Sequence, residues 1–369
     1  MNRRHLLSYT SLATATAILS GCQTEISTIV GGATKSNNPL VEWQMITSWF
    51  PVLTTLQEMA EYIAQRVQDL TDGQFLIEVL SQALPKEQTV LDAVQSGTAQ
   101  CGHTIAHYYS DRNPAFAFGC GMPFGLTPSQ QQAWLYEGGG LEIMQTVYAD
   151  FGTIAFPAAS TGMQMGGWFK REVNTLADLE GLRMRIPGFG GKIFERLGVR
   201  PVSLPPTELA AALEQDVLDA AEWIGPYDDE QLKLYQVAPY YYYPGWWEPG
   251  SSCDLVINQA AWEQLPLHYQ QVLQTVAAEA DSLCLAWYSR KNAQALTRLL
   301  DQGTQLRPFS AEILARCQTE TLDFLADIAA ENVTFRTVYA TWQQFRQELY
   351  RWASITDLAF GNASFLTSS

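Results

Sequence analysis

The sequence predicts an α/β protein of two lobes. Strand-like and helical segments alternate from residue 41 to about residue 105, and a second alternation occupies residues 161–221. Such alternation is typical of a mainly parallel sheet covered by helices. Two long helical stretches follow, near residues 262–302 and 310–350. Two lobes joined by crossing strands would place a ligand in the cleft between them, where pockets commonly form.

The elements of the first lobe follow from hydrophobic periodicity. Residues 41–49 (VEWQMITSW) favour a strand, and apolar residues then recur at helical spacing as far as Leu70, with Gly73 as the C-cap. A strand at 75–79, a helix from about residue 86 to Gly97 and a strand at 99–105 come next. Thr127, with proline after it and Gln130 three positions on, predicts a capping box at the start of another helix.

The second lobe is predicted from a similar alternation. Residues 162–169 (GMQMGGWF) and 182–187 (LRMRIP) favour strands, residues 191–197 and 207–214 favour helices, and a strand at 254–257 returns the chain to the first lobe. We therefore expect one lobe from residues 41–160 and 254–293. The other lobe would contain residues 161–253 and 294–369, including the C-terminal helices.

The amino terminus has the layout of an export signal. Arg3 and Arg4 precede a short apolar run, which ends in Leu-Ser-Gly before Cys22 and resembles a lipoprotein cleavage box. The paired arginines suit Tat export, and the general layout suits Sec export. We expect residues 1–21 to be a signal peptide, Cys22 to be lipidated, and residues 22–40 to be a flexible tether that anchors the body to a membrane.

The net charge argues against several classes of partner. It is -16 at pH 7, so nucleic acids and anionic lipid surfaces are poor partners. An anionic ligand would need a local cationic site. Apart from Cys22, the five cysteines are odd in number and widely spaced, which suggests neither a zinc site nor a redox motif. A disulfide between Cys101 and Cys120 is one alternative, and we expect buried free thiols instead.

Two arginines on one predicted strand are candidates for binding a carboxylate. Arg183 and Arg185 are two residues apart and would share a face of the strand. A guanidinium offers two parallel charge-assisted hydrogen bonds to a carboxylate. Arg185 lies at the end of the strand where α/β sheets present ligands. From the pattern alone, both arginines are equally well explained as solvated surface residues.

Two acids beside tryptophans form a second candidate group. Glu222 precedes Trp223, and Glu248 follows two tryptophans. They can be a general acid and base, surface charges, or, with Gln164, oxygen ligands of a hard cation such as Ca²⁺. His103 and His107 are four residues apart, but the segment is predicted as a strand leading into a loop, so a structural role is favoured over zinc binding.

Ordered motifs along most of the chain resemble one family. The chain resembles the periplasmic receptors of tripartite ATP-independent periplasmic (TRAP) transporters, in the branch that binds 2-oxo acids such as pyruvate with a metal cation. The motifs are TSW (47–49), GTAQ (97–100) with GH (102–103), PFGL (123–126), TGMQMGGWF (161–169), LRMRIPG (182–188), EWIGPY (222–227) and YYYPGW (241–246).

The resemblance implies a two-lobed periplasmic solute-binding fold with a hinge, and it assigns roles to residues. Arg185 would bind the carboxylate of the ligand. The cation, Na⁺ or Ca²⁺, would be held by Gln164, Glu222, Glu248 and the backbone carbonyl of Trp223. The pocket would be lined by Tyr109, Trp223 and Trp49. Ser160 stands where the family pattern has asparagine, which leaves the preferred acid open.

The resemblance also implies partners. The receptor would deliver a small 2-oxo or 2-hydroxy acid to the membrane subunits of a TRAP permease, and it would not be an enzyme. The long C-terminal helices permit a homodimer formed by helix exchange. Two alternatives stay open: an exported enzyme that uses Glu222 and Glu248 as an acid–base pair, and a sensory ligand-binding subunit.

Overall fold

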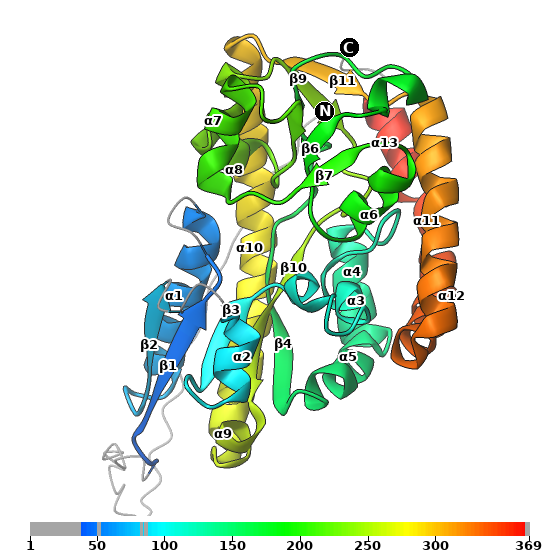
Figure 1. The fold of residues 1–369 in the computed structure, drawn as a ribbon. Coiled ribbons are helices and arrows are strands. Elements are labelled where there is room, and N and C mark those ends of the chain that lie inside the picture. Colours follow the sequence, from blue (N-terminus) through cyan, green and yellow to red (C-terminus); the bar gives the residue numbers. More distant parts are fainter. Residues whose placement is uncertain (1–37, 50–52, 82–83, 85–87, 366–369) are drawn as a thin grey trace, which may run out of the picture. The chain divides into compact units, whose positions relative to one another are not determined.

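The computed structural model describes residues 38–49, 53–81, 84 and 88–365, nearly all within the compact unit Leu40–Ser369. These residues form two β-sheets with helices around them (Figure 1). The predicted signal peptide, Cys22 and most of the predicted tether lie outside the described residues. None of the described helices combines the length and the apolar character that crossing a membrane would need.

The first sheet has five strands in the order β2-β1-β3-β10-β4. β1 pairs in parallel with β2 and β3, whereas β10 runs antiparallel to both β3 and β4. The strands are β1 (Val41–Thr47), β2 (Phe75–Ser81), β3 (Cys101–Thr104), β4 (Thr153–Ser160) and β10 (Ser252–Asn258). Helix α1 (Thr54–Leu70) buries the apolar positions that its periodicity predicted, including Met59, Ile63 and Val67.

The second sheet has six short strands in the order β11-β9-β5-β8-β6-β7. β6 lies between β7 and β8 and pairs in parallel with both. The strands are β5 (Trp168–Phe169), β6 (Arg183–Arg185), β7 (Arg200–Val202), β8 (Ala220–Ala221), β9 (Tyr240–Tyr243) and β11 (Gln305–Pro308). Residues 162–167 of the predicted strand at 162–169 turn instead, because Gly162 and Gly167 adopt left-handed backbone angles, with φ of 67° and 81°.

The chain passes between the two sheets three times. It leaves the first sheet after β4, returns at β10, and leaves again along the long helix α10 (Leu267–Asp301) before β11. Figure 1 shows α10 running beside the strands of both sheets. The α/β class, the two sheets and the long C-terminal helices confirm the predicted architecture. The exact division of the chain into lobes stays a prediction.

Shorter helices cover the two sheets. They are α2 (Val90–Gln95), α3 (Phe116–Cys120), α4 (Pro128–Glu137), α5 (Gly140–Ala149), α6 (Gly188–Arg196), α7 (Leu209–Glu214), α8 (Pro226–Gln231) and α9 (Gln259–Glu263), with 3-10 turns η1 (Ala106–Tyr109), η2 (Leu176–Leu179), η3 (Pro206–Glu208) and η4 (Leu234–Gln236). The capping box predicted at Thr127 is present at the start of α4.

Two helices occupy the long helical stretch that the sequence predicted near residues 310–350. α11 (Ala311–Glu331) ends at Asn332, whose backbone is extended and whose side chain accepts a hydrogen bond from the Phe335 amide, 2.8 Å away, to begin α12 (Val333–Ile355). α11 packs on α6, and α12 packs on α4 and α5. α13 (Asp357–Phe365) is the last described helix.

An aspartate is buried in the middle of the first sheet. Asp254 of β10 is 5% exposed, and its carboxylate accepts a hydrogen bond of 2.6 Å from the hydroxyl of Tyr148 in α5. Burial raises the pKa of Asp254 to about 7, although the Tyr148 hydrogen bond opposes this effect. The protonated acid is therefore the form that the fold favours.

The first prediction concerns Asp254→Asn. Folding raises the pKa of Asp254. Its contribution to the free energy of unfolding is therefore fully present below the ordinary pKa of 3.8 and is lost as the pH rises towards about 7. The free energy of unfolding of the wild type minus that of Asp254→Asn should fall by up to about 1.4 kcal/mol per pH unit in this window. Urea unfolding at several pH values measures it, with the exposed Asp323→Asn as the control. A flat difference would contradict the assignment.

Candidate functional site

A cavity of about 40 Å³ lies between residues of the two sheets. Its walls come from three parts of the fold. The first-sheet side contributes Trp49, Leu53, Leu56, Ile105, His107 and Tyr108; the second-sheet side contributes Arg185, Pro187, Glu222, Trp223 and Ile224; and the crossing segments contribute Thr161, Gln164, Glu248 and Ser251. The cavity therefore combines a cation, two acids and an amide with an apolar wall.

The register of β6 and β8 places Arg185 beside Glu222. Arg185 pairs with Ala221, and the Glu222 amide donates to the Arg185 carbonyl at 3.0 Å. The Arg185 guanidinium also donates to Glu222: its Nη1 lies 2.7 Å from Glu222 Oε1 and 2.9 Å from the Glu222 carbonyl oxygen. It also lies 4.9 Å from the centre of the Trp223 ring. Both charged side chains are nearly buried, at 12% and 6% exposed.

The neighbouring arginine has a different environment. Arg183 donates to both carboxylate oxygens of Asp219 at 2.9 and 2.7 Å, and 39% of its side chain is exposed. Asp219 is a carboxylate partner that lies outside the cavity walls. Arg183 is therefore a surface residue of this strand, and Arg185 is the arginine that lines the cavity.

Burial dominates the protonation of Glu222. It raises the pKa of Glu222 to about 8, because desolvation outweighs the opposing charge of Arg185 and the Glu248 carboxylate adds repulsion. An additional positive charge in the cavity would favour the ionised form.

Glu248 is held by a different set of groups. Its Oε1 accepts hydrogen bonds from Cys120 Sγ at 2.6 Å and Ser251 Oγ at 2.8 Å, and it lies 3.2 Å from His107 Nδ1. Burial alone would raise the pKa of Glu248, but the His107 ring and these hydrogen bonds outweigh it and lower that pKa below its ordinary value. Glu248 is therefore the more readily ionised of the two acids.

The crossing segments bring an amide to the same cavity. Gln164 Nε2 donates to Thr161 Oγ1 at 3.0 Å and to Ser251 Oγ at 2.6 Å. Within the described part of the chain, its Oε1 accepts no hydrogen bond, so that oxygen is available as a ligand. Two carboxylates, an amide oxygen and nearby backbone carbonyls form a donor set that suits Na⁺ or Ca²⁺. The residues at this site therefore fit a hard cation.

The structure brings most of the predicted site residues together, but not all of them. Trp49 and Trp223 line the cavity with Arg185, Gln164, Glu222 and Glu248. Tyr109 does not line it: its hydroxyl is hydrogen bonded to Thr104 Oγ1 at 2.7 Å, and its ring packs on Phe116. Ser160 does not line it either, and its hydroxyl accepts from the Gly162 amide at 3.4 Å.

Four polar residues of the cavity wall were not predicted as site residues from the sequence: His107, Tyr108, Thr161 and Ser251. Tyr108 occupies the wall position expected for Tyr109, because both lie on the 3-10 turn η1, where each residue rotates the side chain by about 120°. The sequence singles out His107 only by its spacing from His103. The two histidines separate: His103 Nδ1 accepts from Trp49 Nε1 at 2.8 Å, and His107 contacts Glu248. Ser251 carried no sequence signal.

Comparison with known proteins assigns this architecture to one family. Residues 47–332 match the model of the bacterial extracellular solute-binding proteins, family 7. The chain is 46% identical over 372 residues to a monocarboxylate 2-oxoacid-binding periplasmic protein of Nostoc sp., and the match covers all of both chains.

Two solved structures are also similar. One is a TRAP periplasmic solute-binding protein from Colwellia psychrerythraea with bound calcium and pyruvate, at 32% identity and a TM-score of 0.85, covering 88% of this chain and 99% of that one. The other is from Pseudoalteromonas atlantica with bound sodium and pyruvate, at 32% identity and a TM-score of 0.82, covering 87% and 98%.

The second prediction tests the buried pair by stability alone. Arg185→Met leaves Glu222 buried without its partner, which typically costs about 3–5 kcal/mol. The loss should grow as the pH rises above about 8, because Glu222 ionises there in the wild type beside Arg185, whereas without Arg185 the ionised form is unfavourable; below its raised pKa of about 8, Glu222 is protonated in both proteins. Chemical denaturation at these pH values measures the effect.

Matched variants complete this test. Arg183→Met removes an exposed arginine from the same strand and should produce no such pH dependence. Arg185→Met/Glu222→Gln should recover most of the stability at high pH, because the buried charge is gone. If the double variant were as unstable as the single one, the loss would come from packing and not from an unpaired carboxylate.

Proposed function

The chain belongs to family 7 of the bacterial extracellular solute-binding proteins, and from that membership we propose that it is the periplasmic receptor of a TRAP transporter for a small 2-oxo acid such as pyruvate, bound together with Na⁺ or Ca²⁺. The family consists of substrate-binding receptors. The observation that carries the proposal is the cavity in which Arg185 lies against Glu222, with Glu248 and Gln164 on the adjoining walls.

We propose that Arg185 binds the carboxylate of the acid, and that Gln164, Glu222, Glu248 and the backbone carbonyl of Trp223 hold the cation. The charges in the cavity support this division of roles. With both acids ionised, one arginine leaves an excess of one negative charge, which repels an anion. A divalent cation reverses the sign, and a monovalent cation neutralises it. The cation would contact oxygens of both the protein and the acid.

Three aromatic residues of the cavity wall would contact the rest of the acid. Trp49 and Trp223 form the apolar wall against the small alkyl part of the acid, and Tyr108 adds a hydroxyl. The cavity of about 40 Å³ holds about three water molecules, so a three-carbon acid needs the lobes to move apart on entry. We take residues 41–160 with 254–293 and residues 161–253 with 294–369 as the moving lobes.

We further propose that the receptor is a lipoprotein. Cleavage before Cys22 by the export machinery, reached through Tat or Sec, would leave a lipidated cysteine and a tether up to residue 40. This arrangement would keep the receptor at the membrane that contains the permease. The leader sequence, which lies outside the described residues, supports this proposal.

The third prediction tests the function. Calorimetric titration of the metal-loaded protein with pyruvate should show one site. Arg185→Ala should weaken binding by more than about 2 kcal/mol, roughly 30-fold, because it removes the charge partner of a buried carboxylate. Removing Na⁺ and Ca²⁺ by dialysis against chelator in a potassium buffer should also weaken binding. Arg183→Ala is the matched control and should bind as the wild type does.

The outcomes separate the functional classes. Unchanged pyruvate affinity in Arg185→Ala would contradict the carboxylate assignment, and unchanged affinity without Na⁺ and Ca²⁺ would contradict the cation assignment. Pyruvate should be recovered intact and stoichiometric after incubation. Its turnover would identify an enzyme acting through Glu222 and Glu248 instead of a receptor.

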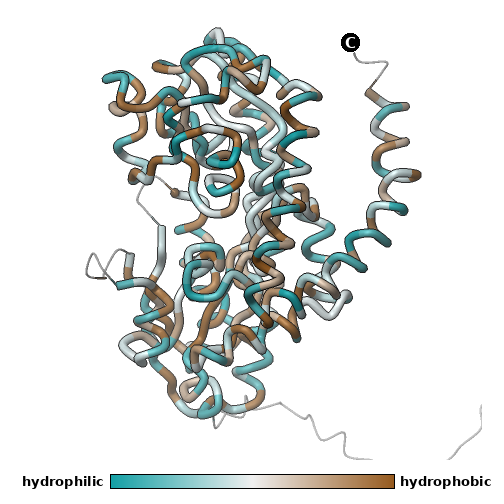
Figure 2. Tube along the Cα trace, turned by 45° about the vertical axis from the view of Figure 1, so that its right-hand side comes forward, coloured by the Kyte–Doolittle hydropathy of each residue, from teal (hydrophilic) through white to brown (hydrophobic). Residues whose placement is uncertain are grey.

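We also propose a homodimer through the C-terminal helices. α13 buries none of its residues, and its apolar side chains are exposed: Leu358 60%, Phe360 73% and Phe365 75%. In Figure 2 the last described helix extends to the side of the other helices, with hydrophobic positions along it. Exposed apolar surface of this kind is typical of an interaction site.

The fourth prediction follows from this exposed helix. Light scattering of the eluting protein should give the mass of two chains, and a chain that ends at Thr356 should elute as a monomer with unchanged pyruvate binding. A full-length chain that stays monomeric at high concentration would contradict the dimer. Phe360→Ser with Phe365→Ser is a milder variant that should weaken association without shortening the chain.

A further inference from the structure

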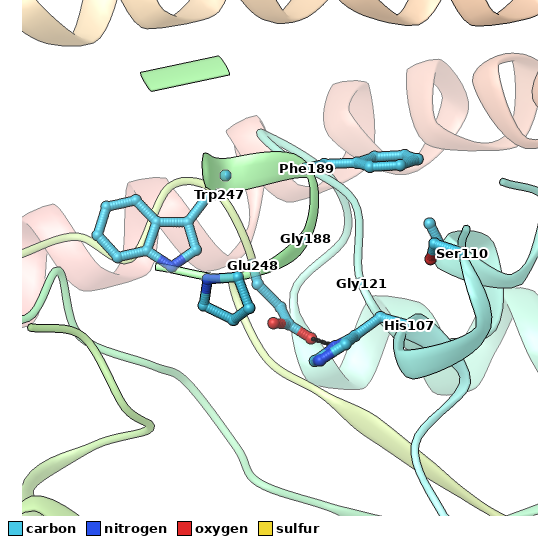
Figure 3. Close-up of a pocket in the computed structure, with 10 residues that line it drawn as sticks. His107, Ser110, Gly121, Gly188, Phe189, Trp247 and Glu248 are labelled. Atoms are coloured by element: carbon cyan, nitrogen blue, oxygen red, sulfur yellow. Dashed lines mark hydrogen bonds and ion pairs between the residues drawn. The ribbon is translucent and has the colours of Figure 1, made fainter. Parts of the chain in front are cut away.

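A second, smaller cavity also borders Glu248 and His107. It has a volume of about 20 Å³, room for about one water molecule, and its lining includes His107, Ser110, Phe189, Trp247 and Glu248. Figure 3 shows the His107 ring and the Glu248 carboxylate pointing toward one another at this cavity. The other nitrogen of His107, Nε2, is buried and has no hydrogen-bond partner among the described residues.

Three different ligand types meet beside this cavity. His107 comes from η1, Cys120 from the end of α3, and Glu248 from the segment after β9. Their ligand atoms all lie within 4.8 Å of one another. The Cys120 thiol, which is fully buried, already donates to Glu248 Oε1 at 2.6 Å, and it lies 3.4 Å from His107 Nδ1.

The separations resemble those around a tetrahedral metal. With bonds of about 2.0–2.3 Å, neighbouring ligand atoms of a tetrahedral zinc lie about 3.3–3.6 Å apart. The distances of 3.2 Å from His107 to Glu248 and 3.4 Å from Cys120 to His107 are close to these values. The distance from Cys120 to Glu248 would lengthen by about 1 Å when a metal replaces the thiol proton. The cavity next to them has room for a water as the fourth ligand.

We propose that His107, Cys120 and Glu248 form a binding site for a borderline-soft divalent cation such as Zn²⁺. Imidazole and thiolate select this class of metal, whereas Na⁺ and Ca²⁺ take oxygen ligands. The site is therefore chemically distinct from the hard-cation site on Gln164, Glu222 and Trp223, although the two share Glu248. The side chains of His107 and Glu248 are 17% and 15% exposed, which gives a metal access to them.

Sharing Glu248 makes the two sites compete. Zinc would take Oε1 of Glu248 and withdraw negative charge from the hard-cation site, so zinc should lower the affinity for Ca²⁺ and for the organic acid together. This consequence rests on the proposed function, whereas zinc binding itself does not.

The binding test uses cobalt as the probe and no organic acid. Full-length protein carrying Cys22→Ser, which removes the one cysteine outside the described residues, is titrated with Co²⁺ under reducing conditions. A thiolate-to-cobalt charge-transfer band in the near ultraviolet should appear at one equivalent and disappear when Zn²⁺ is added. Cys120→Ser should abolish the band, and His107→Gln should weaken cobalt and zinc binding by more than about 100-fold, more than the loss of an outer-shell partner.

Cys317→Ser is the matched control. Cys317 is a fully buried free thiol in α11, away from the cavity, and its removal should leave the band and the zinc affinity unchanged. Circular dichroism checks that each variant is folded, and Cys120→Ala replaces Cys120→Ser if serine unfolds the chain. The proposal would be overturned if the zinc affinity were the same in Cys120→Ser, His107→Gln and the control. It would also be overturned if no cobalt band appeared in the protein that carries Cys22→Ser alone.

The competition test is separate. In the Cys22→Ser background, Zn²⁺ should raise the apparent Kd of pyruvate at fixed Ca²⁺, and Cys120→Ser should remove most of this effect. A normal cobalt band with no effect of zinc on pyruvate would leave the metal site standing and overturn its coupling to the ligand. A normal band with no pyruvate binding under any condition would refute the proposed function alone.

Discussion

Two carboxylates and one guanidinium share a small cavity, and the rest of the site depends on how their charges are balanced. Arg185 can neutralise only one acid, and it lies against Glu222. Glu248 is stabilised separately, by a histidine, a thiol and a hydroxyl. This arrangement explains how a protein with a net charge of -16 can bind an anion, because a bound cation would supply the missing positive charge and release Arg185 to the ligand.

The fold sets this geometry through short backbone pairings. Arg185 ends β6, and its pairing with Ala221 places Glu222 beside it at the carboxyl ends of these two strands. The two other acceptors come from the crossing segments, where Gln164 follows a left-handed glycine and Glu248 precedes β10. The site is therefore assembled where the chain changes sheets, and a movement between the lobes would alter all of its contacts together.

Sequence periodicity predicted the regular parts of this structure well. The apolar spacing of α1, the cap at Thr127 and the alternation of strands and helices depend on local physics, and each is found. The break at Asn332 was not predicted, because asparagine is tolerated within helices and acts as a cap only in a particular backbone conformation. The strand was predicted too long at 162–169, because apolar spacing does not reveal that Gly162 and Gly167 adopt left-handed backbone angles.

The candidate site, too, could be predicted only in part from local sequence. Pattern alone left Arg183 and Arg185 equivalent, and their separation depends on Asp219 and Glu222, which are distant in sequence. The family motifs singled out Arg185 and, as proposed cation ligands, Gln164, Glu222 and Glu248. The choice of Tyr109 over Tyr108 differed from the structure by one residue, since a 3-10 turn sends neighbouring side chains in different directions. His107 and Cys120 meet Glu248 only through tertiary packing.

We expect Arg185 to leave Glu222 for the carboxylate of the ligand when the cation binds. A crystal structure of the protein with Ca²⁺ and pyruvate would show this exchange. In it, the guanidinium of Arg185 should contact the pyruvate carboxylate, while a metal lies on the carboxylates of Glu222 and Glu248 and the amide oxygen of Gln164. Bound pyruvate with Arg185 still on the Glu222 carboxylate, and no metal beside it, would rule this exchange out.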